Sequence, residues 1–381
     1  MTHPYRDVAI VGVHNTQQAR QLPGHTSSTI AMEGALGALA DAGVDVHDVD
    51  AVVSQFAQEL VLQLRLGPST RVLNMLGIPS VLDAASLIAE GRAEVVLIAA
   101  GGAGIYTDRS ATAPWTRPAN EFVVGYGLFT AAEFALMARR HMVMHGTTPE
   151  QLATVAMRIR NHGHANPQAV YFGRGPFTTD DILASRMVAD PFHLLDCSMT
   201  AEGGCGLVLT TAERAADLPG TPVWILGAAS DSFGPAYQIA PAWDMKHHRG
   251  DIPAGYVGRR AAKIAFGTAG LTPADVDTCE FYDPFSFEII RQFEAFGFCG
   301  DGEGGAFVEE GSVPFTTDGG TMSFSHAGIN AQQIQRVIRG VEQVRGSCAT
   351  SQVPDCEVAL CSNGGSGALF NDVVLVGKER P

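Results

Sequence analysis

The stretch Ala93–Gly104 reads AEVVLIAAGGAG, and this pattern decides the fold. A short, continuous apolar run that ends in a glycine-rich turn is typical of a strand buried on both faces. A second version of the pattern, CEVALCSNGGSG, occupies Cys356–Gly367, and each version follows a helix-like segment that ends near a glycine. Two buried strands of the same design therefore lie far apart in one chain.

An earlier pair of segments repeats in the same order. Ala42–Val53 (AGVDVHDVDAVV) and Ala269–Glu280 (AGLTPADVDTCE) both close a helix with Ala-Gly, turn through Asp-Val-Asp and enter an apolar segment. Because order and element type both match, we interpret the pairs as an internal duplication rather than as chance similarity between βαβ units. We predict an α/β fold of two similar halves, residues 1–220 and 221–381, with a loop domain at about 106–192 inserted in the first.

Composition disfavours several classes of function. A formal net charge of −15 over 381 residues argues against nucleic-acid binding, which needs clustered Lys and Arg. The seven cysteines show no CxxC spacing, and the paired histidines lack the spacing of metal ligands, so no disulfide framework or metal site is predicted. No apolar run approaches the ~18 residues of a membrane span. The N-terminal residues lack a signal-peptide pattern, and we expect a cytoplasmic protein.

The segment Glu280–Glu288 (EFYDPFSFE) places a tyrosine and an aspartate at the end of a predicted strand, where open α/β sheets bind ligands. Tyr282 is either a proton-transfer residue or a core tyrosine whose hydroxyl bonds to a backbone carbonyl. Asp283 fits the N-cap of a helix over Pro284–Phe296, since proline is favoured at the first helical position.

Two further candidates lie in glycine-rich turns. His326 stands within Gly319–Gly328 (GGTMSFSHAG), before a predicted helix at Ala331–Val344, and is either an acid–base residue or a structural histidine. Cys361 ends the second buried strand and is either a thiolate stabilised by the amides of its turn or a small buried hydrophobe. The residues alone leave both alternatives open.

Several segments, taken together and in order, resemble the thiolase superfamily, specifically the sterol-carrier-protein-type thiolases and their lipid-transfer-protein relatives. The resemblance implies a five-layered αβαβα fold, a tight homodimer and acyl-CoA substrates, with no tightly bound cofactor because CoA enters as part of the substrate. The segments are Val8–Val13 (VAIVGV), Glu90–Ala99 (EGRAEVVLIA), Leu194–Ser198 (LLDCS), Thr210–Arg214 (TTAER), Gly297–Phe307 (GFCGDGEGGAF), Gly319–Gly328 and Cys361–Gly367 (CSNGGSG).

The resemblance assigns positions residue by residue. His326 matches the histidine of the thiolase Gly-His-Pro turn, and Cys361 matches the second thiolase cysteine. The nucleophilic cysteine falls at Asn74, and asparagine cannot form an acyl-enzyme. Ordinary thiolase turnover is therefore not expected. A subgroup that lacks this cysteine consists of retro-aldolases that shorten steroid side chains. Their catalytic tyrosine matches Tyr282, whereas a second tyrosine of theirs falls near His326.

The resemblance thus implies cleavage of a β-hydroxyacyl-CoA between Cα and Cβ, with a steroid side-chain thioester as substrate. Tyr282 would take the hydroxyl proton, and His326 with the Cys361–Gly364 turn would stabilise or protonate the enolate. The residues expected to contact substrate are Asn74, Asp283, Gly328 and Gly364.

Aldolases of this kind, by resemblance, work with a small OB-fold partner that often carries a zinc ribbon, and we expect such a partner in a heterotetramer. The apolar stretch Phe122–Phe129 is compatible with a bulky substrate. Two alternatives remain. One is a divergent thiolase or acyltransferase that uses another cysteine, such as Cys361, and the other is a catalytically inactive subunit that binds acyl-CoA.

Overall fold

The computed structural model describes residues 3–104, 131–232, 257–364 and 370–381. The apolar stretch Phe122–Phe129 and the start of the predicted loop domain lie outside these residues. Within them, nine strands form one mixed sheet in the order β3-β2-β4-β7-β1-β8-β11-β10-β9, and β5 pairs with β6 separately. The strands are β1 Val8–Asn15, β2 Ala51–Val53, β3 Arg71–Leu73, β4 Val95–Gly102, β5 Met187–Ala189, β6 Phe192–His193, β7 Gly203–Thr211, β8 Val223–Ser232, β9 Thr278–Glu280, β10 Val358–Ser362 and β11 Phe370–Gly377.

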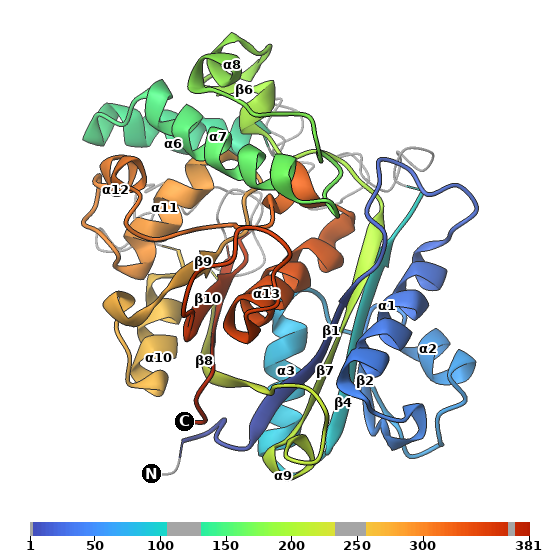
Figure 1. Cartoon of the computed structure of the whole chain (residues 1–381). Coiled ribbons are helices and arrows are strands. Elements are labelled where there is room, and N and C mark those ends of the chain that lie inside the picture. Colours follow the sequence, from blue (N-terminus) through green and yellow to red (C-terminus); the bar gives the residue numbers. More distant parts are fainter. Residues whose placement is uncertain (1–2, 105–130, 233–256, 365–369) are drawn as a thin grey trace.

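Helices pack on both faces of this sheet (Figure 1). A π-helical turn, Gly320–Phe324, precedes the last of them. The helices are α1 Ser27–Ala42, α2 Ala57–Gln63, α3 Ile78–Ala89, α6 Ala131–His145, α7 Pro149–Ala165, α8 Thr179–Ala184, α9 Ala212–Ala215, α10 Arg259–Ala269, α11 Ser286–Phe296, α12 Gly304–Glu310 and α13 Gly328–Arg345.

Alternating strand side chains divide the apolar core into three clusters. In β1, Ile10 packs in the cluster that contains α3 and α13, whereas Ala9 packs in the cluster that contains α1 and α2. In β11, Val374 faces α3 and α13, whereas Leu375 packs with α10 and α11. The layers therefore run α1 and α2, the N-terminal strands, α3 and α13, the C-terminal strands, then α10 and α11 (Figure 1). The predicted five-layered αβαβα fold is confirmed.

The echoing sequence segments occupy equivalent strands. In the first pair of repeated segments, Ala93–Gly104 contains β4 and Cys356–Gly367 contains β10. The other pair contains β2 and β9, and β4 pairs in parallel with β2 as β10 does with β9. From the centre outward, β1-β7-β4-β2 on one side corresponds to β8-β11-β10-β9 on the other. The two sides meet where β1 pairs with β8 at Ala9–Trp224 and Ile10–Val223. The two similar halves inferred from the sequence are thus visible in the topology.

Local contacts set the ends of two helices. Helix α1 begins at Ser27, where Thr26 and Thr29 form a capping box. Helix α7 continues past Gly163 to Ala165. Gly163 allows the π-helical turn to pack against α7, since a Cβ at that position would collide with the Ser323 side chain.

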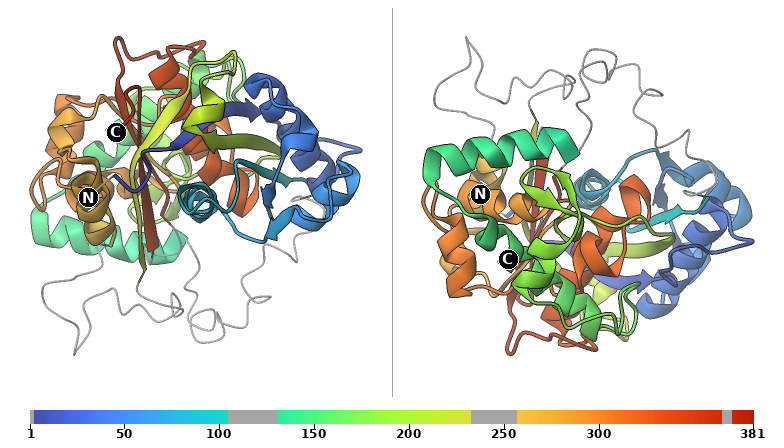
Figure 2. Two further views of the ribbon diagram at one scale, coloured as in Figure 1. Left: turned by 90° about the horizontal axis from the view of Figure 1, so that it is seen from below. Right: turned by 90° about the horizontal axis from the view of Figure 1, so that it is seen from above.

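Helices α6, α7 and α8, with the β5–β6 hairpin, lie across one end of the C-terminal half (Figures 1 and 2). Arg160 of α7 is 1% exposed and holds these helices to the rest of the fold. Its guanidinium donates to three backbone carbonyls, those of Leu195 at 2.7 Å, Cys197 at 2.9 Å and Met322 at 3.0 Å. One side chain therefore ties α7 to the π-helical turn and to the segment before β7.

Candidate active site

Tyr282 and His326, two of the residues selected from the sequence, meet in the fold. The phenol Oη lies 3.3 Å from His326 Nε2, and the ring centroids are 6.2 Å apart. Tyr282 is 7% exposed, and His326 is partly exposed. The structure therefore joins the Tyr-Asp-Pro turn after β9 to the turn before α13.

A backbone hydrogen bond fixes the tautomer of His326. Its Nδ1 lies 2.9 Å from the carbonyl oxygen of Met199, and it must donate because a carbonyl can only accept. Nε2 then carries no hydrogen, so it accepts the hydrogen of the Tyr282 hydroxyl. The contact has a defined direction, from phenol to imidazole.

Both members of this pair are neutral at neutral pH. Burial raises the pKa of Tyr282 above its ordinary value of 10.0 and lowers the pKa of His326 from 6.5 to about 4. A phenol with a raised pKa is a poor base by itself. It can accept a proton on its oxygen if it passes its own proton to a neighbouring base at the same time. The pair has the geometry of such a relay.

The turn that carries His326 is held by the N-terminal half. The Ala201 amide donates to the carbonyl of His326 at 3.2 Å, and Ser325 Oγ donates to Gln18 Oε1 at 2.6 Å. Gly102, at the end of β4, permits the close approach, since a Cβ there would collide with the carbonyl oxygen of Ala327. His326 therefore lies at the carboxyl end of β4, as expected for a site in an α/β sheet.

The backbone of Tyr282 is held from within the C-terminal half. Gln292 of α11 donates from Nε2 to the Tyr282 carbonyl at 2.9 Å. The same side chain accepts at Oε1 from Ser362 Oγ of β10 at 2.5 Å. These bonds connect the tyrosine to the strand end that precedes the last glycine-rich turn.

Asp283 is not a helix cap, so that prediction was wrong. Helix α11 begins at Ser286 with Phe285 as its N-cap. The fully buried carboxylate of Asp283 instead accepts from the amides of Thr321 at 2.7 Å and Met322 at 3.0 Å, and from Thr321 Oγ1 at 3.1 Å. Burial raises the pKa of Asp283 from 3.8 to about 7. Asp283, which was predicted to contact the substrate, thus anchors the π-helical turn Gly320–Phe324.

Cys361 lies in the buried core and forms no hydrogen bond with the Tyr282–His326 pair among the described residues, so its predicted catalytic role stays a prediction. Its side chain is fully buried in the apolar cluster that contains α3 and α13, and it points at Gly340 of α13. Its backbone pairs with Glu280 of β9, two residues before Tyr282, whereas its Sγ points to the helix. This geometry supports the alternative that the Cys361 thiol is a small buried apolar group in the core.

The remaining cysteines offer no nucleophile either. All seven are free, and burial raises the pKa of every one of their thiols. Cys197 forms a backbone bridge to Phe285, but its Sγ contacts the carbonyl of His193 at 3.3 Å and burial raises the pKa of its thiol to about 12. A thiolate is the reactive form of cysteine, and none is favoured here.

The three other predicted contact residues are dispersed. Gly328 begins α13, two residues after His326, and adjoins the relay. Gly364 packs against Glu288, which lies close enough for its charge to act on the Tyr282 phenol. Asn74 is exposed in the loop between β3 and α3, four residues before that helix begins. The two glycines therefore adjoin residues around the Tyr282–His326 pair, and Asn74 is exposed in its loop.

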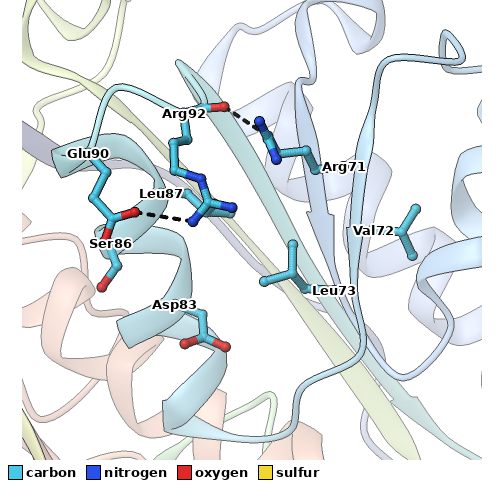
Figure 3. A pocket seen from close by; sticks show the side chains of 8 residues that line it. All are labelled: Arg71, Val72, Leu73, Asp83, Ser86, Leu87, Glu90 and Arg92. Carbon is cyan, nitrogen blue, oxygen red and sulfur yellow. Dashed lines mark hydrogen bonds and ion pairs between the residues drawn. The ribbon is translucent and has the colours of Figure 1, made fainter.

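A surface hollow of about 660 Å³ lies at the sheet edge rather than at the relay (Figure 3). Its walls are strand β3 and helix α3, and Figure 3 shows Arg92 bonded to Glu90 and Arg71 bonded to the Arg92 carbonyl. The hollow contains neither Tyr282 nor His326. Its lining residues are Arg71, Val72, Leu73, Asp83, Ser86, Leu87, Glu90 and Arg92.

Sequence reasoning missed the carbonyl of Met199, which sets the His326 tautomer. No residue type signals a backbone acceptor, so only the fold could reveal it. Across the four described ranges, no group of three or more His, Cys, Asp or Glu side chains is arranged to hold a metal ion. None of the helices in those ranges is long and apolar enough to cross a membrane.

Comparisons with known proteins agree with this architecture. Residues 244–378 match the family model described as "Thiolase C-terminal domain-like". The chain is 31% identical to "17-hydroxy-3-oxo-4-pregnene-20-carboxyl-CoA lyase" of Mycobacterium tuberculosis, over 96% of this chain and 98% of that protein. The chain belongs to the thiolase superfamily.

Two further members of the thiolase superfamily show its range. An "Acetyl-CoA acetyltransferase" of Methanothermobacter thermautotrophicus is also 31% identical, over 95% of this chain and 97% of that protein. The solved structure titled "Ltp2-ChsH2(DUF35) aldolase" is 28% identical and superposes with a TM-score of 0.82, covering 98% of this chain and 99% of that chain. The family predicted from the sequence motifs is confirmed.

Proposed function

We propose that this chain is a carbon–carbon lyase that cleaves a β-hydroxyacyl-CoA between Cα and Cβ. The observation that carries the proposal is the Tyr282–His326 relay in a thiolase fold whose seven cysteines are all free and disfavoured as thiolates. Retro-aldol cleavage requires a proton acceptor for the hydroxyl group and no covalent intermediate. Full-length similarity to a lyase and to an aldolase structure supports this reaction class.

In the proposed reaction, the β-hydroxyl group donates its proton to Tyr282 Oη while the phenolic proton moves to His326 Nε2. The electron pair of the Cα–Cβ bond moves to the thioester and forms its enolate, and the β-carbon becomes a ketone. Protonation at Cα then yields the shortened acyl-CoA, so atoms and charge balance without a redox cofactor. CoA enters and leaves as part of the thioester.

The geometry favours a different role for His326 from the one first expected. Its Nδ1 hydrogen is engaged with Met199, and its Nε2 lone pair faces the phenol. Neutral His326 therefore has no hydrogen to offer an enolate oxygen. We assign it the role of terminal proton acceptor, and the proton it gains is available to return through Tyr282 for Cα protonation.

We propose a steroid side-chain thioester as the substrate and a small OB-fold protein as the partner. The first proposal is supported by the printed name of the mycobacterial relative, a pregnene carboxyl-CoA lyase. The second is supported by the match to an aldolase structure whose title includes a DUF35 component. Seven free cysteines are consistent with the reducing cytoplasm as the working compartment.

A homodimer is part of the proposal, because strand β3 pairs on one side only, with β2, among the described residues and forms an edge of the sheet. Beside it, Val72, Met75 and Leu76 are 43%, 36% and 42% exposed. An apolar sheet edge of this kind is typical of an interface between chains. A Val72→Lys variant should shift the mass measured by light scattering from dimer to monomer. A wild-type chain that is monomeric at assay concentrations would remove the homodimer from the proposal.

The acetyltransferase relative keeps a second candidate function open, a divergent thiolase or acyltransferase. One experiment separates the candidates. The purified chain, alone and with its co-purified partner, is incubated with a steroid β-hydroxyacyl-CoA, and ketone and shortened acyl-CoA are quantified by chromatography. Equal amounts of both products, with no acyl-enzyme in the intact-protein mass spectrum, support the lyase. A trapped acyl-enzyme would instead identify an acyltransferase, and absence of both would favour an inactive subunit.

A further inference from the structure

The segment Leu194–Ala201 begins with the LLDCS motif and is bonded to both of the turns that carry the relay. It meets the Tyr-Asp-Pro turn after β9, where the Ser198 amide donates to the Pro284 carbonyl at 2.9 Å. Two residues earlier, the buried Asp196 carboxylate accepts at 2.7 Å from Ser286 Oγ, at the start of α11. The segment is therefore held against the side of the site that carries the tyrosine.

The same segment bonds to the His326 side of the site. The Met199 amide donates to the Thr321 carbonyl at 3.1 Å, and the Ala201 amide donates to the His326 carbonyl at 3.2 Å. Between these two bonds, the Met199 carbonyl accepts from His326 Nδ1 at 2.9 Å. The acceptor that fixes the imidazole therefore belongs to a segment that is bonded to both relay turns.

Arg160 of α7 holds this segment in place. Its Nε and Nη2 donate to the carbonyls of Leu195 and Cys197 in the segment, and its Nη1 donates to the carbonyl of Met322 in the π-helical turn. Because the guanidinium is planar and its N–H groups point in fixed directions, these bonds fix the segment relative to the turn. Met199 lies two residues after Cys197, so the direction of its carbonyl depends on this anchor.

We propose that Arg160 is a positioning residue for the proposed reaction. It keeps Leu194–Ala201 where the Met199 carbonyl fixes the tautomer and the direction of the His326 ring. This inference rests on the proposed lyase function for its effect on rate. The tautomer of His326 can be observed without any turnover.

The test uses full-length protein labelled with nitrogen-15 histidine, in which two-bond hydrogen–nitrogen NMR correlations show which ring nitrogen carries the hydrogen. The His326 signals are identified by their loss in His326→Gln. In the wild type, the hydrogen should be on Nδ1. In Arg160→Met, and in Arg160→Lys, whose ammonium does not reproduce the guanidinium fork, His326 should show a mixture of both tautomers.

Arg345→Met is the matched control. Arg345 is the last residue of α13, and its side chain is 10% exposed. Its guanidinium also makes three bonds, to the carbonyls of Val11 at 2.8 Å and Thr221 at 2.9 Å and to Asp41 Oδ2 at 2.9 Å. Loss of these bonds should lower stability and leave the His326 tautomer and kcat as in the wild type, because they lie at the opposite end of α13 from His326.

Kinetics supply the second measurement. Both Arg160 variants should lower kcat by about 10²-fold, the cost of misplacing a catalytic group by about 1 Å, and leave KM close to that of the wild type. A wild-type spectrum with the hydrogen on Nε2 would overturn the inference. Unchanged His326 signals in the folded Arg160 variants would do the same, as would an equal change in Arg345→Met.

The two proposals can fail separately. If the wild type cleaves no thioester while the Arg160 variants still change the tautomer, the lyase proposal fails and the role of Arg160 in fixing His326 stands. If Arg160→Met does not fold, the spectrum of Arg160→Lys decides.

Discussion

Replacing Tyr282 by Phe removes one oxygen atom and retains the buried ring, so it separates chemistry from folding. The lost bond to His326 is long, at 3.3 Å, and His326 is partly exposed, so water can replace the phenol at Nε2. A neutral hydrogen bond contributes about 0.5–1.5 kcal/mol net. We therefore expect the free energy of unfolding to fall by no more than about 1.5 kcal/mol.

The expected effect on rate is much larger. A positioned acid–base group contributes about 10²- to 10⁴-fold, which corresponds to about 3–5 kcal/mol of transition-state stabilisation. The assay is a quenched single-turnover reaction with a steroid β-hydroxyacyl-CoA, scored by ketone release. Tyr5→Phe is the matched control, since Tyr5 is a partly buried phenol just before β1 that packs against the apolar cluster containing α3 and α13. A folded Tyr282→Phe enzyme with turnover within about tenfold of wild type would refute the relay.

Three other predictions follow from the same geometry. Since the pKa of His326 is lowered to about 4, kcat/KM should stay level as the pH falls from about 7 to 5 and decline only near pH 4. A decline in kcat/KM centred near the ordinary histidine pKa of 6.5 would contradict the assigned neutral imidazole. Arg160→Met should lower the free energy of unfolding by about 3 kcal/mol in denaturant titrations, because three buried carbonyls lose their shared donor. Cys361→Ala should retain turnover within about threefold at a cost of about 1–2 kcal/mol in stability, and loss of activity in the folded variant would restore the thiol as a participant.

The fold was predictable because its signal is local and repeated. The apolar runs of β4 and β10 and the glycine turns after them identify equivalent buried strands without any knowledge of their packing. Tyr282 and His326 could be selected as candidates for a similar reason, since each follows an element end where α/β sheets gather functional side chains.

Sequence patterns were insufficient where long-range geometry decides the contacts of a side chain. Asp283 next to a proline has the local pattern of a helix cap, but amides from the π-helical turn provide its partners. Cys361 and Ser362 are adjacent on β10 and point to opposite faces, so the thiol faces α13 while the hydroxyl reaches Gln292. A shift of one residue in a strand reverses the face that a side chain occupies, and sequence alone does not determine which neighbour turns towards a site.

The fixed orientation of the Tyr282 hydroxyl group has a stereochemical consequence. Its hydrogen points to His326, which lies on one side of the phenol, and the imidazole is itself fixed by Met199. A substrate hydroxyl can then reach the phenol oxygen from one direction only. The enzyme should therefore cleave one configuration at the β-carbon and leave the epimer intact. Run in reverse, the same site should join ketone and enolate on a single face and build one stereoisomer of the alcohol.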